Sequence, residues 1–269
     1  MKIKFLFLVI FHCIVVIAFS QNESNTIIKN IETIITHKNI EGVIYHTYEE
    51  YNTNGQLTKQ YYITKDYNKK HRLMYEYQYS NKLIKKIINY QNQDEPLTIE
   101  YFHKDGKLIK NAYRFFKNEK EILKNKATNY TDYTYDKDTI IGKTYHYNKD
   151  ENKYLLFKIT KEVLDNNKNI IQEKHIFEDG NYSINTYKYD QDNRLVSETT
   201  PSAEYHYKYN KKRNLLEEFQ KTDSYSNSTK FSYTYDKNGN WIERLKFTDI
   251  NYDKKSTLTS KTKRIIKYY

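Results

Sequence analysis

Aromatic residues alternate with polar residues along much of the chain, as in the segment that ends at Tyr235. There Phe231, Tyr233 and Tyr235 are separated by single polar residues. A period of two predicts β-strands with one aromatic face. Asn238-Gly239 follows this segment, and Asn-Gly favours the positive φ angles of a tight turn. A second alternating segment begins at Trp241, so the pattern predicts a β-hairpin.

The same frame recurs along the chain as an aromatic or leucine residue, a polar turn and an apolar anchor. Full copies occupy 51–57, 102–108, 189–195, 209–215 and 235–241, weaker copies 116–122, 135–141 and 164–170, and a shortened copy 79–83. At roughly 12 residues per strand and turn, residues 43–269 hold on the order of 18 strands. A flat sheet of that size is unfavourable. The predicted fold is all-β, an antiparallel meander of repeated hairpins in a coiled or partly closed sheet, forming a single domain over 43–269.

The second strand of each hairpin departs from simple alternation. Counting by twos from the anchor Trp241 places Arg244 and Lys246 opposite the aromatic rows. The same count places Glu243, and likewise Glu217, on the aromatic face. The residue directly after an anchor is often apolar, which a sheet with one buried face does not predict. A β-bulge, a switch of face or burial of both faces would each explain this.

Residues 1–20 have the features of a secretory signal peptide. A lysine-containing start precedes an apolar run over 5–19, and Ala18 and Ser20 are the small residues that predict cleavage before Gln21. The run is shorter than the roughly 20 residues that span a bilayer. We therefore expect export, and no integral membrane segment after cleavage.

Residues 21–42 are expected to form an N-terminal cap on the repeat domain. Isoleucines at 27, 28, 31, 34 and 35 recur at helical spacing, and Ser24 or Asn25 can cap the start. The spacing predicts one short amphipathic helix over 24–38. We expect it to pack on the first strands and to cover an exposed edge of the sheet.

Charge and composition restrict the classes of partner. The formal charge is +11, and loss of Lys2 and Lys4 with the leader lowers it to +9. This charge favours acidic partners such as an anionic polysaccharide, and export argues against nucleic acid. The single cysteine, Cys13, is also lost with the leader. Burial and ladder hydrogen bonds, rather than disulfides, must then stabilise the domain.

The sequence contains no motif for catalysis, a cofactor or a metal. It has no nucleophile elbow, no His-Glu-x-x-His, no phosphate loop and no paired cysteines. Turn tips such as Asp190-Gln-Asp192 carry carboxylate oxygens of the kind that bind calcium, although one tip supplies too few of them. The same residues favour tight turns without any ion. We expect no cofactor, no bound metal and no enzymatic activity.

Two copies share a Tyr-x-Tyr-Asp pattern: Thr-Tyr-Lys-Tyr-Asp-Gln-Asp-Asn-Arg-Leu from 186 and Ser-Tyr-Thr-Tyr-Asp-Lys-Asn-Gly-Asn-Trp from 232. This pattern resembles the tyrosine-aspartate (YD) repeats of Rhs-type proteins, and the likeness covers most of 45–250. Asn52 and Asn210 replace the aspartate in other copies. The resemblance implies long strands in a spiralling sheet and carbohydrate binding. The chain is shorter than the toxin-shell members and lacks their proline-rich core, so it resembles a short secreted form.

Aromatic rows on one face and basic residues on the other are the candidate ligand-binding groups. Flat rings with polar edges suit sugars, and basic side chains suit acidic groups. These residues are Tyr187, Tyr189, Tyr205, Tyr207, Tyr209, Tyr233, Tyr235, Trp241, Lys188, Lys208, Arg244 and Lys246. The alternative is structural, because tyrosine is a good strand former and can build the core of such a sheet.

We expect an exported, non-enzymatic binding or structural protein of the cell envelope, in the periplasm, at the outer-membrane surface or outside the cell. Its expected partner is an anionic polysaccharide or an envelope protein. One alternative is a protein–protein interaction module, with an immunity or adaptor role in a Rhs-like system. The other is an outer-membrane β-barrel. Lys261, Lys263 and Lys267 argue against it, because they alternate where a lipid-facing strand requires apolar residues.

Overall fold

The computed structural model describes residues 27–37, 43–63, 71–91, 96–115, 127–249 and 257–269. Within these ranges the chain forms eighteen β-strands and no helix. The strands are β1 (Ile28–His37), β2 (Val43–Tyr51), β3 (Leu57–Ile63), β4 (His71–Ser80), β5 (Leu83–Asn89), β6 (Leu97–Lys104), β7 (Lys107–Phe115), β8 (Asn129–Asp136), β9 (Thr139–Asn148), β10 (Lys153–Leu164), β11 (Ile170–Phe177), β12 (Tyr182–Tyr189), β13 (Leu195–Thr199), β14 (Glu204–Tyr209), β15 (Leu215–Lys221), β16 (Ser226–Tyr235), β17 (Trp241–Asp249) and β18 (Thr257–Tyr268). The all-β class, the antiparallel meander and the number of strands are confirmed.

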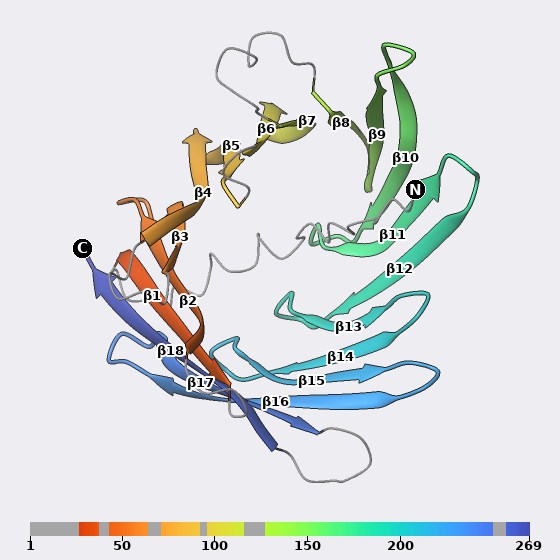
Figure 1. Cartoon of the computed structure of the whole chain (residues 1–269). Coiled ribbons are helices and arrows are strands. Elements are labelled where there is room, and N and C mark those ends of the chain that lie inside the picture. Colours follow the sequence, from red (N-terminus) through yellow and green to blue (C-terminus); the bar gives the residue numbers. More distant parts are fainter. Residues whose placement is uncertain (1–26, 38–42, 64–70, 92–95, 116–126, 250–256) are drawn as a thin grey trace, which may run out of the picture.

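The described strands close into a ring in which each strand pairs antiparallel with the next one along the chain. The first strand also pairs with the last: Ile34 of β1 lies opposite His46 of β2 on one side and Lys263 of β18 on the other. The sheet is therefore a closed up-and-down barrel (Figure 1). The predicted sheet was coiled or only partly closed, whereas closure is complete. Closure removes the edges that an open sheet would expose to other chains.

The predicted N-terminal helix is wrong for the residues that the structure describes. Residues 28–37 form strand β1, and residues 24–26 lie outside the described ranges. Isoleucine and threonine are β-branched, so they fit a strand better than a helix. Alternation along β1 places Ile31 and Ile35 on one face and Ile34 on the other. This segment is thus a strand of the barrel wall between β2 and β18, not a cap over an edge.

A β-bulge after the anchor resets the alternation in the second strand of the hairpins. In the β16–β17 pair, Tyr235 lies opposite Trp241. The next pair is Thr234 with Glu243, so Ile242 is the extra residue and Glu243 leaves the aromatic face. The pairs β12–β13 and β14–β15 shift register at the equivalent position. The bulge is therefore the correct one of the three explanations for the apolar residues that follow the anchors.

The bulge also moves other side chains to the face opposite the predicted one. Glu217 lies opposite Lys208, away from the aromatic rows where it was expected. Arg244 lies opposite Tyr233, and Lys246 is two residues further along the same face. Both basic residues therefore share a face with the tyrosines. The predicted placement of these three side chains was wrong because counting by twos ignored one inserted residue.

The barrel wall has two faces of different chemistry. We call one the tyrosine face, which carries Tyr51, Tyr77, Tyr101, Tyr113, Tyr133, Tyr187, Tyr207 and Tyr233. We call the other the charged face, which carries Lys59, Lys86, Lys110, Lys143, Lys161, Lys174, Lys188, Lys208, Lys230 and Lys261. One face must line the inside of the ring and the other must cover the outside.

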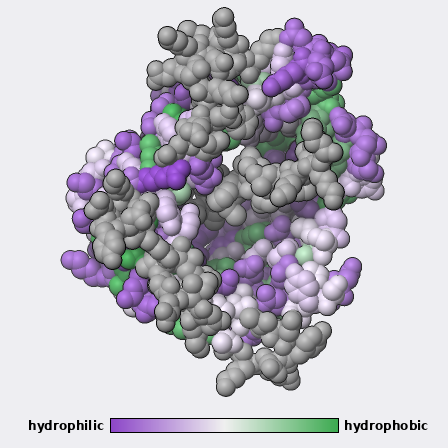
Figure 2. All heavy atoms as spheres, in the orientation of Figure 1, coloured by the Kyte–Doolittle hydropathy of each residue, from purple (hydrophilic) through white to green (hydrophobic). Residues whose placement is uncertain are grey.

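The tyrosine face lines the inside. Side chains converge on a concave wall and spread apart on a convex one. Tyr77 and Ile87 are only 8% and 4% exposed, whereas the charged-face residues of β12, β14 and β16 are mostly exposed. The charge of Glu198 on β13 is influenced by Glu173 on β11 and Glu218 on β15, each two strands away. Figure 2 shows the molecule hollowed near its centre, as expected for a barrel of this strand number.

The aspartate of the repeat builds the hairpin turn. The Oδ1 atom of Asp236 accepts hydrogen bonds from the backbone N–H groups of Asn238 and Asn240, both at 2.9 Å. Asp190 makes the equivalent bonds in its own turn. Asn52 accepts the same two bonds at 3.0 Å through its amide oxygen, which explains why asparagine can replace aspartate. These bonds establish a turn role for the Asp-rich tips.

Replacing Gly239 with valine is expected to destabilise the last hairpin. Gly239 has a φ of 79°, and a β-branched residue is strained in this left-handed region. We expect the free energy of unfolding to fall by about 1–2 kcal/mol in urea titrations. Gly239→Asn is the control, since asparagine tolerates positive φ, and it should lose much less. Equal losses for the two variants would show that the φ angle is not the cause.

Candidate functional site

The structure divides the predicted ligand-binding residues between two surfaces. The predicted aromatic residues all lie on the tyrosine face: Tyr187, Tyr189, Tyr205, Tyr207, Tyr209, Tyr233, Tyr235 and Trp241. Arg244 and Lys246 join them there, contrary to the prediction. Lys188 and Lys208 lie on the charged face, as predicted. Only the inner group can form one site, so the inner wall is the candidate functional surface.

Some of the predicted tyrosines bond neighbouring hairpins together. The hydroxyl of Tyr189 donates to the carbonyl of the anchor Ile170 at 3.0 Å. The hydroxyl of Tyr233 donates to the carbonyl of the anchor Leu215 at 2.8 Å. Other hairpins repeat this tyrosine-to-anchor bond. For these side chains the structural role is shown, because each bond joins the first strand of one hairpin to the second strand of the preceding one.

Strands β11 to β15 carry a strip of tyrosines and glutamates on the inner wall. Tyr187 donates its hydroxyl to Glu173 at 3.1 Å, and Tyr207 donates to Glu198 at 3.3 Å. Burial raises the pKa of Glu198; the hydroxyl of Tyr207 opposes this change, while the charges of Glu173 and Glu218 add to it. The strip is acidic and rich in hydrogen-bonding groups. It suits neutral polar ligands better than acidic ones.

Glu198 and Glu217 should respond to pH in opposite ways. The pKa of Glu198 is raised in the folded state. Ionisation of Glu198 therefore destabilises the folded protein as the pH rises above the pKa that this residue has in the unfolded chain. The pKa of Glu217 is lowered, first by its hydrogen bond from Lys208, so its contribution is present above the unfolded pKa and lost in acid. We expect Glu198→Gln to raise the melting temperature at pH 7 and Glu217→Gln to lower it.

The melting temperatures of both variants are measured from pH 7 to about pH 4, near the unfolded pKa of a glutamate. Both differences from the parent protein should shrink on acidification. The Glu217 effect should be small, because exposed ion pairs contribute little. Effects of the same sign at pH 7 would contradict the opposite pKa shifts of the two glutamates.

A second cluster lies on β16 to β18, where two arginines contact the single tryptophan of the chain. The guanidinium carbon of Arg264 lies 3.6 Å from the Trp241 ring centroid, and that of Arg244 lies 5.5 Å from it. Arg244 also lies 5.4 Å from the Phe231 ring. Tyr233 packs edge-on against Trp241, with ring centroids 6.0 Å apart. These cation–π contacts hold both guanidinium groups at the wall.

The acidic residue Glu49 lies near this cluster and accepts hydrogen bonds from other side chains. The carboxylate of Glu49 on β2 accepts hydrogen bonds from Tyr51 at 2.8 Å and Gln60 at 3.0 Å. Burial lowers the pKa of Arg264; the negative charge of Glu49 opposes this change and the positive charge of Arg244 adds to it. Two guanidinium charges therefore face one carboxylate. This part of the inner wall is positive, in contrast to the strip on β11 to β15.

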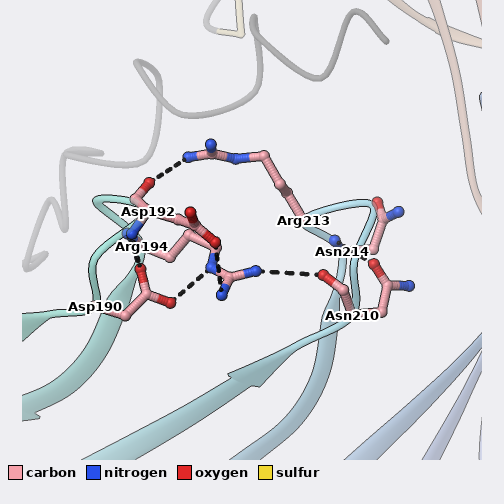
Figure 3. Close-up of polar contacts among 6 residues, drawn as sticks. All are labelled: Asp190, Asp192, Arg194, Asn210, Arg213 and Asn214. Atoms are coloured by element: carbon pink, nitrogen blue, oxygen red, sulfur yellow. Dashed lines mark hydrogen bonds and ion pairs between the residues drawn. The ribbon is translucent and has the colours of Figure 1, made fainter.

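Adjacent turns are bonded together at one rim of the barrel (Figure 3). Arg194 pairs through Nε with Asp190 at 2.7 Å, and its Nη1 donates to the carbonyl of Asn210 at 3.4 Å. Arg213 donates from Nη2 to the carbonyl of Asp192 at 3.0 Å. These bonds join the β12–β13 turn to the β14–β15 turn. The rim fixes the spacing of the hairpins and so the spacing of the groups on the inner wall.

Ion pairs run across the strands on the outside of the barrel. Lys208 pairs with Glu217 at 2.8 Å, and Glu217 also lies opposite Lys230 on the next strand. Further round the ring, Lys261 pairs with Glu243 at 2.7 Å. Such exposed pairs add little to stability. Their main consequence is that charged side chains lie along this part of the outer wall.

The described residues contain neither a metal-binding group nor a membrane-spanning helix. No group of three or more His, Cys, Asp or Glu side chains among them could hold a metal ion. Within the same ranges, no helix is long and apolar enough to cross a membrane. His206 is nearly half exposed on the charged face and pairs with Glu204 at 3.0 Å, which fits a solvent-facing side chain.

The architecture defines the class of the protein as a closed up-and-down antiparallel β-barrel. No model of a known protein family matches the chain, and no curated protein does. A porin-like protein from Bacteroides vulgatus is similar at 14% identity and a TM-score of 0.40, covering 91% of this chain and 99% of that one. A porin-like protein from Bacteroides uniformis is similar at 11% identity and a TM-score of 0.33, covering 89% and 98%. A protein of unknown function from Bacteroides fragilis is similar at 13% identity and a TM-score of 0.29, covering 62% and 95%. At these values nothing about the function of this chain follows.

The sequence reasoning missed part of the inner wall. Arg264, Glu49 and Glu198 were not among the predicted site residues, although each lies on the tyrosine face. A usable signal was present in the repeat. Skipping one residue after the anchor Leu195 and then counting by twos places Glu198 with the tyrosines. In the β12–β13, β14–β15 and β16–β17 hairpins, the apolar residue after the anchor marks the position to skip.

Proposed function

We propose that the protein is an exported, water-soluble β-barrel of the cell envelope that binds a ligand against its inner wall. The observation that carries this proposal is the division of chemistry between the faces. Tyrosine rings line the inside, together with the glutamates of β11 to β15 and the arginines of β17 and β18, and lysines on many strands face the outside. Export rests on the features of residues 1–20, which lie outside the described ranges.

The charges on the outer wall support a barrel surrounded by water. A lysine or arginine on a lipid-facing strand costs about 2–4 kcal/mol at the bilayer midplane. Lys110 on β7, Lys143 on β9 and Lys161 on β10 lie on the charged face, and similar residues continue round the ring. The tyrosine face would also be unfavourable against lipid, since it carries the charged residues Glu198 and Arg264. Exposed apolar side chains such as Phe102, Leu156 and Ile265 also lie on the charged face. Lysines interrupt them, so the described part of this face forms no continuous apolar band of the kind that a bilayer requires.

The inner wall favours a saccharide as the ligand. Tyrosine combines a flat apolar ring with a polar edge, which matches the faces and hydroxyl groups of a sugar. Barrels of 16–18 strands enclose an aqueous space, so an extended oligosaccharide could enter. Side chains on rigid strands also provide a preformed site, which lowers the ordering cost of binding.

A glycan array with the purified protein tests this proposal, followed by titration of the best ligand. Tyr205→Ala removes a ring from the inner wall, where its hydroxyl accepts a hydrogen bond from Gln220 at 3.0 Å. Tyr182→Ala is the control, since Tyr182 lies on the charged face and is 63% exposed. We expect at least tenfold weaker binding for Tyr205→Ala and none of this loss for Tyr182→Ala. The proposal fails if no glycan binds, or if the control variant loses binding instead.

An outer-membrane β-barrel is the second candidate. The observation that favours it is the closed ring of an even number of antiparallel strands, which is the arrangement that spans outer membranes. The charged outer wall opposes it. Behaviour in detergent-free buffer separates the two candidates.

A further inference from the structure

Arg244 and Arg264 form a positive cluster on the inner wall that has no counter-ion bonded to it in the described part of the chain. Both arginines contact Trp241, at 5.5 Å and 3.6 Å from the ring centroid. Among the described residues, no carboxylate forms an ion pair with either guanidinium within 4.0 Å. The Nε atoms of both are buried and have no hydrogen-bond partner.

The surroundings leave the cluster with an excess of positive charge. Glu49 lies near Arg264 and keeps its negative charge while it accepts hydrogen bonds from Tyr51 and Gln60, so one carboxylate faces two guanidinium groups. Lys246 adds a further positive charge on the same face. Placing like charges together on a partly buried wall is unfavourable unless an anion joins them. A guanidinium offers a planar fork of N–H donors that fits a carboxylate, sulfate or phosphate group.

Trp241 orients this cluster rather than serving as an open stacking platform. The guanidinium of Arg264 lies over the indole ring at 3.6 Å, so that face of the ring is covered. Stacking fixes the plane of the guanidinium and leaves its N–H edge as the binding element. The acidic strip on β11 to β15 occupies a different arc of the wall, so an anion is favoured at this cluster over that strip.

We propose that Arg244 and Arg264 bind the oxyanion of an acidic saccharide, a carboxylate or a sulfate, at this point of the inner wall. This inference rests on the proposed function and names the charged group of its ligand. The rest of the saccharide would lie along the tyrosines of neighbouring strands. The site therefore distinguishes acidic from neutral saccharides of equal length.

The test is isothermal titration of the purified full chain with a galacturonate oligomer, a sulfated galactan oligomer and a neutral galactan oligomer. Arg264→Gln and Arg244→Gln each remove one guanidinium. Lys263→Gln is the matched control, because Lys263 is the neighbour of Arg264 on the charged face and its loss changes the net charge equally. Circular dichroism verifies that each variant is folded, and Arg264→Lys retains the charge without the fork.

We expect one or both acidic oligomers to bind at least tenfold more tightly than the neutral one. Arg264→Gln and Arg244→Gln should each abolish most of this preference, Arg264→Lys should reduce it, and Lys263→Gln should leave it unchanged. Equal binding of neutral and acidic oligomers would overturn the oxyanion site while leaving the proposed function intact. Loss of the preference in Lys263→Gln to the same extent would also overturn it, since net charge would then be the cause. Failure of all three oligomers to bind would overturn the oxyanion site. The glycan array would then decide whether the barrel binds any saccharide.

Discussion

Replacing Thr262 with proline is expected to lower the free energy of unfolding by roughly 3 kcal/mol or more, because proline removes a ladder hydrogen bond and leaves its partner unsatisfied. Thr262 is 2% exposed and lies in the middle of β18. It pairs with Arg244 of β17 on one side and Ile35 of β1 on the other. The closed barrel has no edge here, so β18 cannot accommodate proline as an edge strand would.

Gln191→Pro is the matched control for this experiment. Gln191 follows Asp190 at the second position of a hairpin turn, where the Asn193 N–H donates to the Asp190 carbonyl at 3.0 Å, and proline is favoured at that position. Urea unfolding should show a large loss for Thr262→Pro and little change for Gln191→Pro. If Thr262→Pro is tolerated as well as the control, then β18 is an edge strand and the ring is open.

Replacing Ile87 with alanine should destabilise the protein by about 2–4 kcal/mol, the usual cost of truncating a buried isoleucine. Ile87 is 4% exposed and packs between Tyr77 and Ile99 in the best-buried apolar cluster among the described residues. It lies directly opposite both of them, on β4 and β6. Because native domains have only about 5–15 kcal/mol of stability, this one truncation removes a large share.

Ile265→Ala provides the comparison for Ile87→Ala. Ile265 lies on the charged face of β18 and is 51% exposed, so its truncation should cost less than about 0.5 kcal/mol. The two variants lose the same atoms, and only the face differs. Equal losses measured by urea unfolding would contradict the assignment of the tyrosine face to the packed inner wall.

The local structure could be predicted from the sequence because each copy of the repeat contains the pattern of a strand, a turn and a second strand. Alternation gave the strands, and the anchor six residues after the aromatic residue gave the hairpins. The aspartate and asparagine residues marked the turns that they stabilise in the structure, as Asp236 does. The likeness to tyrosine-aspartate repeats stays a prediction, since no family model matches the chain.

Closure of the ring could not be predicted, because it depends on one strand with an ambiguous pattern. The isoleucines of β1 follow helical spacing, whereas strand alternation divides them between the two faces of the wall. What decides between them is the pairing available to β1 in the folded chain. Without β1, both β2 and β18 would have an edge with unpaired backbone N–H and C=O groups. A helix could not pair with either edge, whereas the strand β1 pairs with both. Tertiary context therefore overrode the local pattern.

The inner wall was predicted in part, and two side chains were misplaced because of one inserted residue in the second strand of their hairpins. The aromatic rows were placed together correctly because they precede the bulge. Arg244 and Glu217 follow it, so both were assigned to the wrong face. Arg264 was missed for another reason. Its neighbours Trp241 and Arg244 are near in the fold through the β17–β18 pairing, which no repeat in the sequence indicates.

Purification of the mature chain without detergent, followed by flotation with liposomes of envelope lipids, tests the central claim most directly. In the proposed arrangement the charged face lies outside and the tyrosine face surrounds an aqueous lumen. It therefore predicts a monodisperse β-rich protein in detergent-free buffer that stays in the dense fractions, apart from the liposomes. Precipitation without detergent, together with stable insertion into the liposomes, would show that lipid surrounds the barrel and would contradict the account.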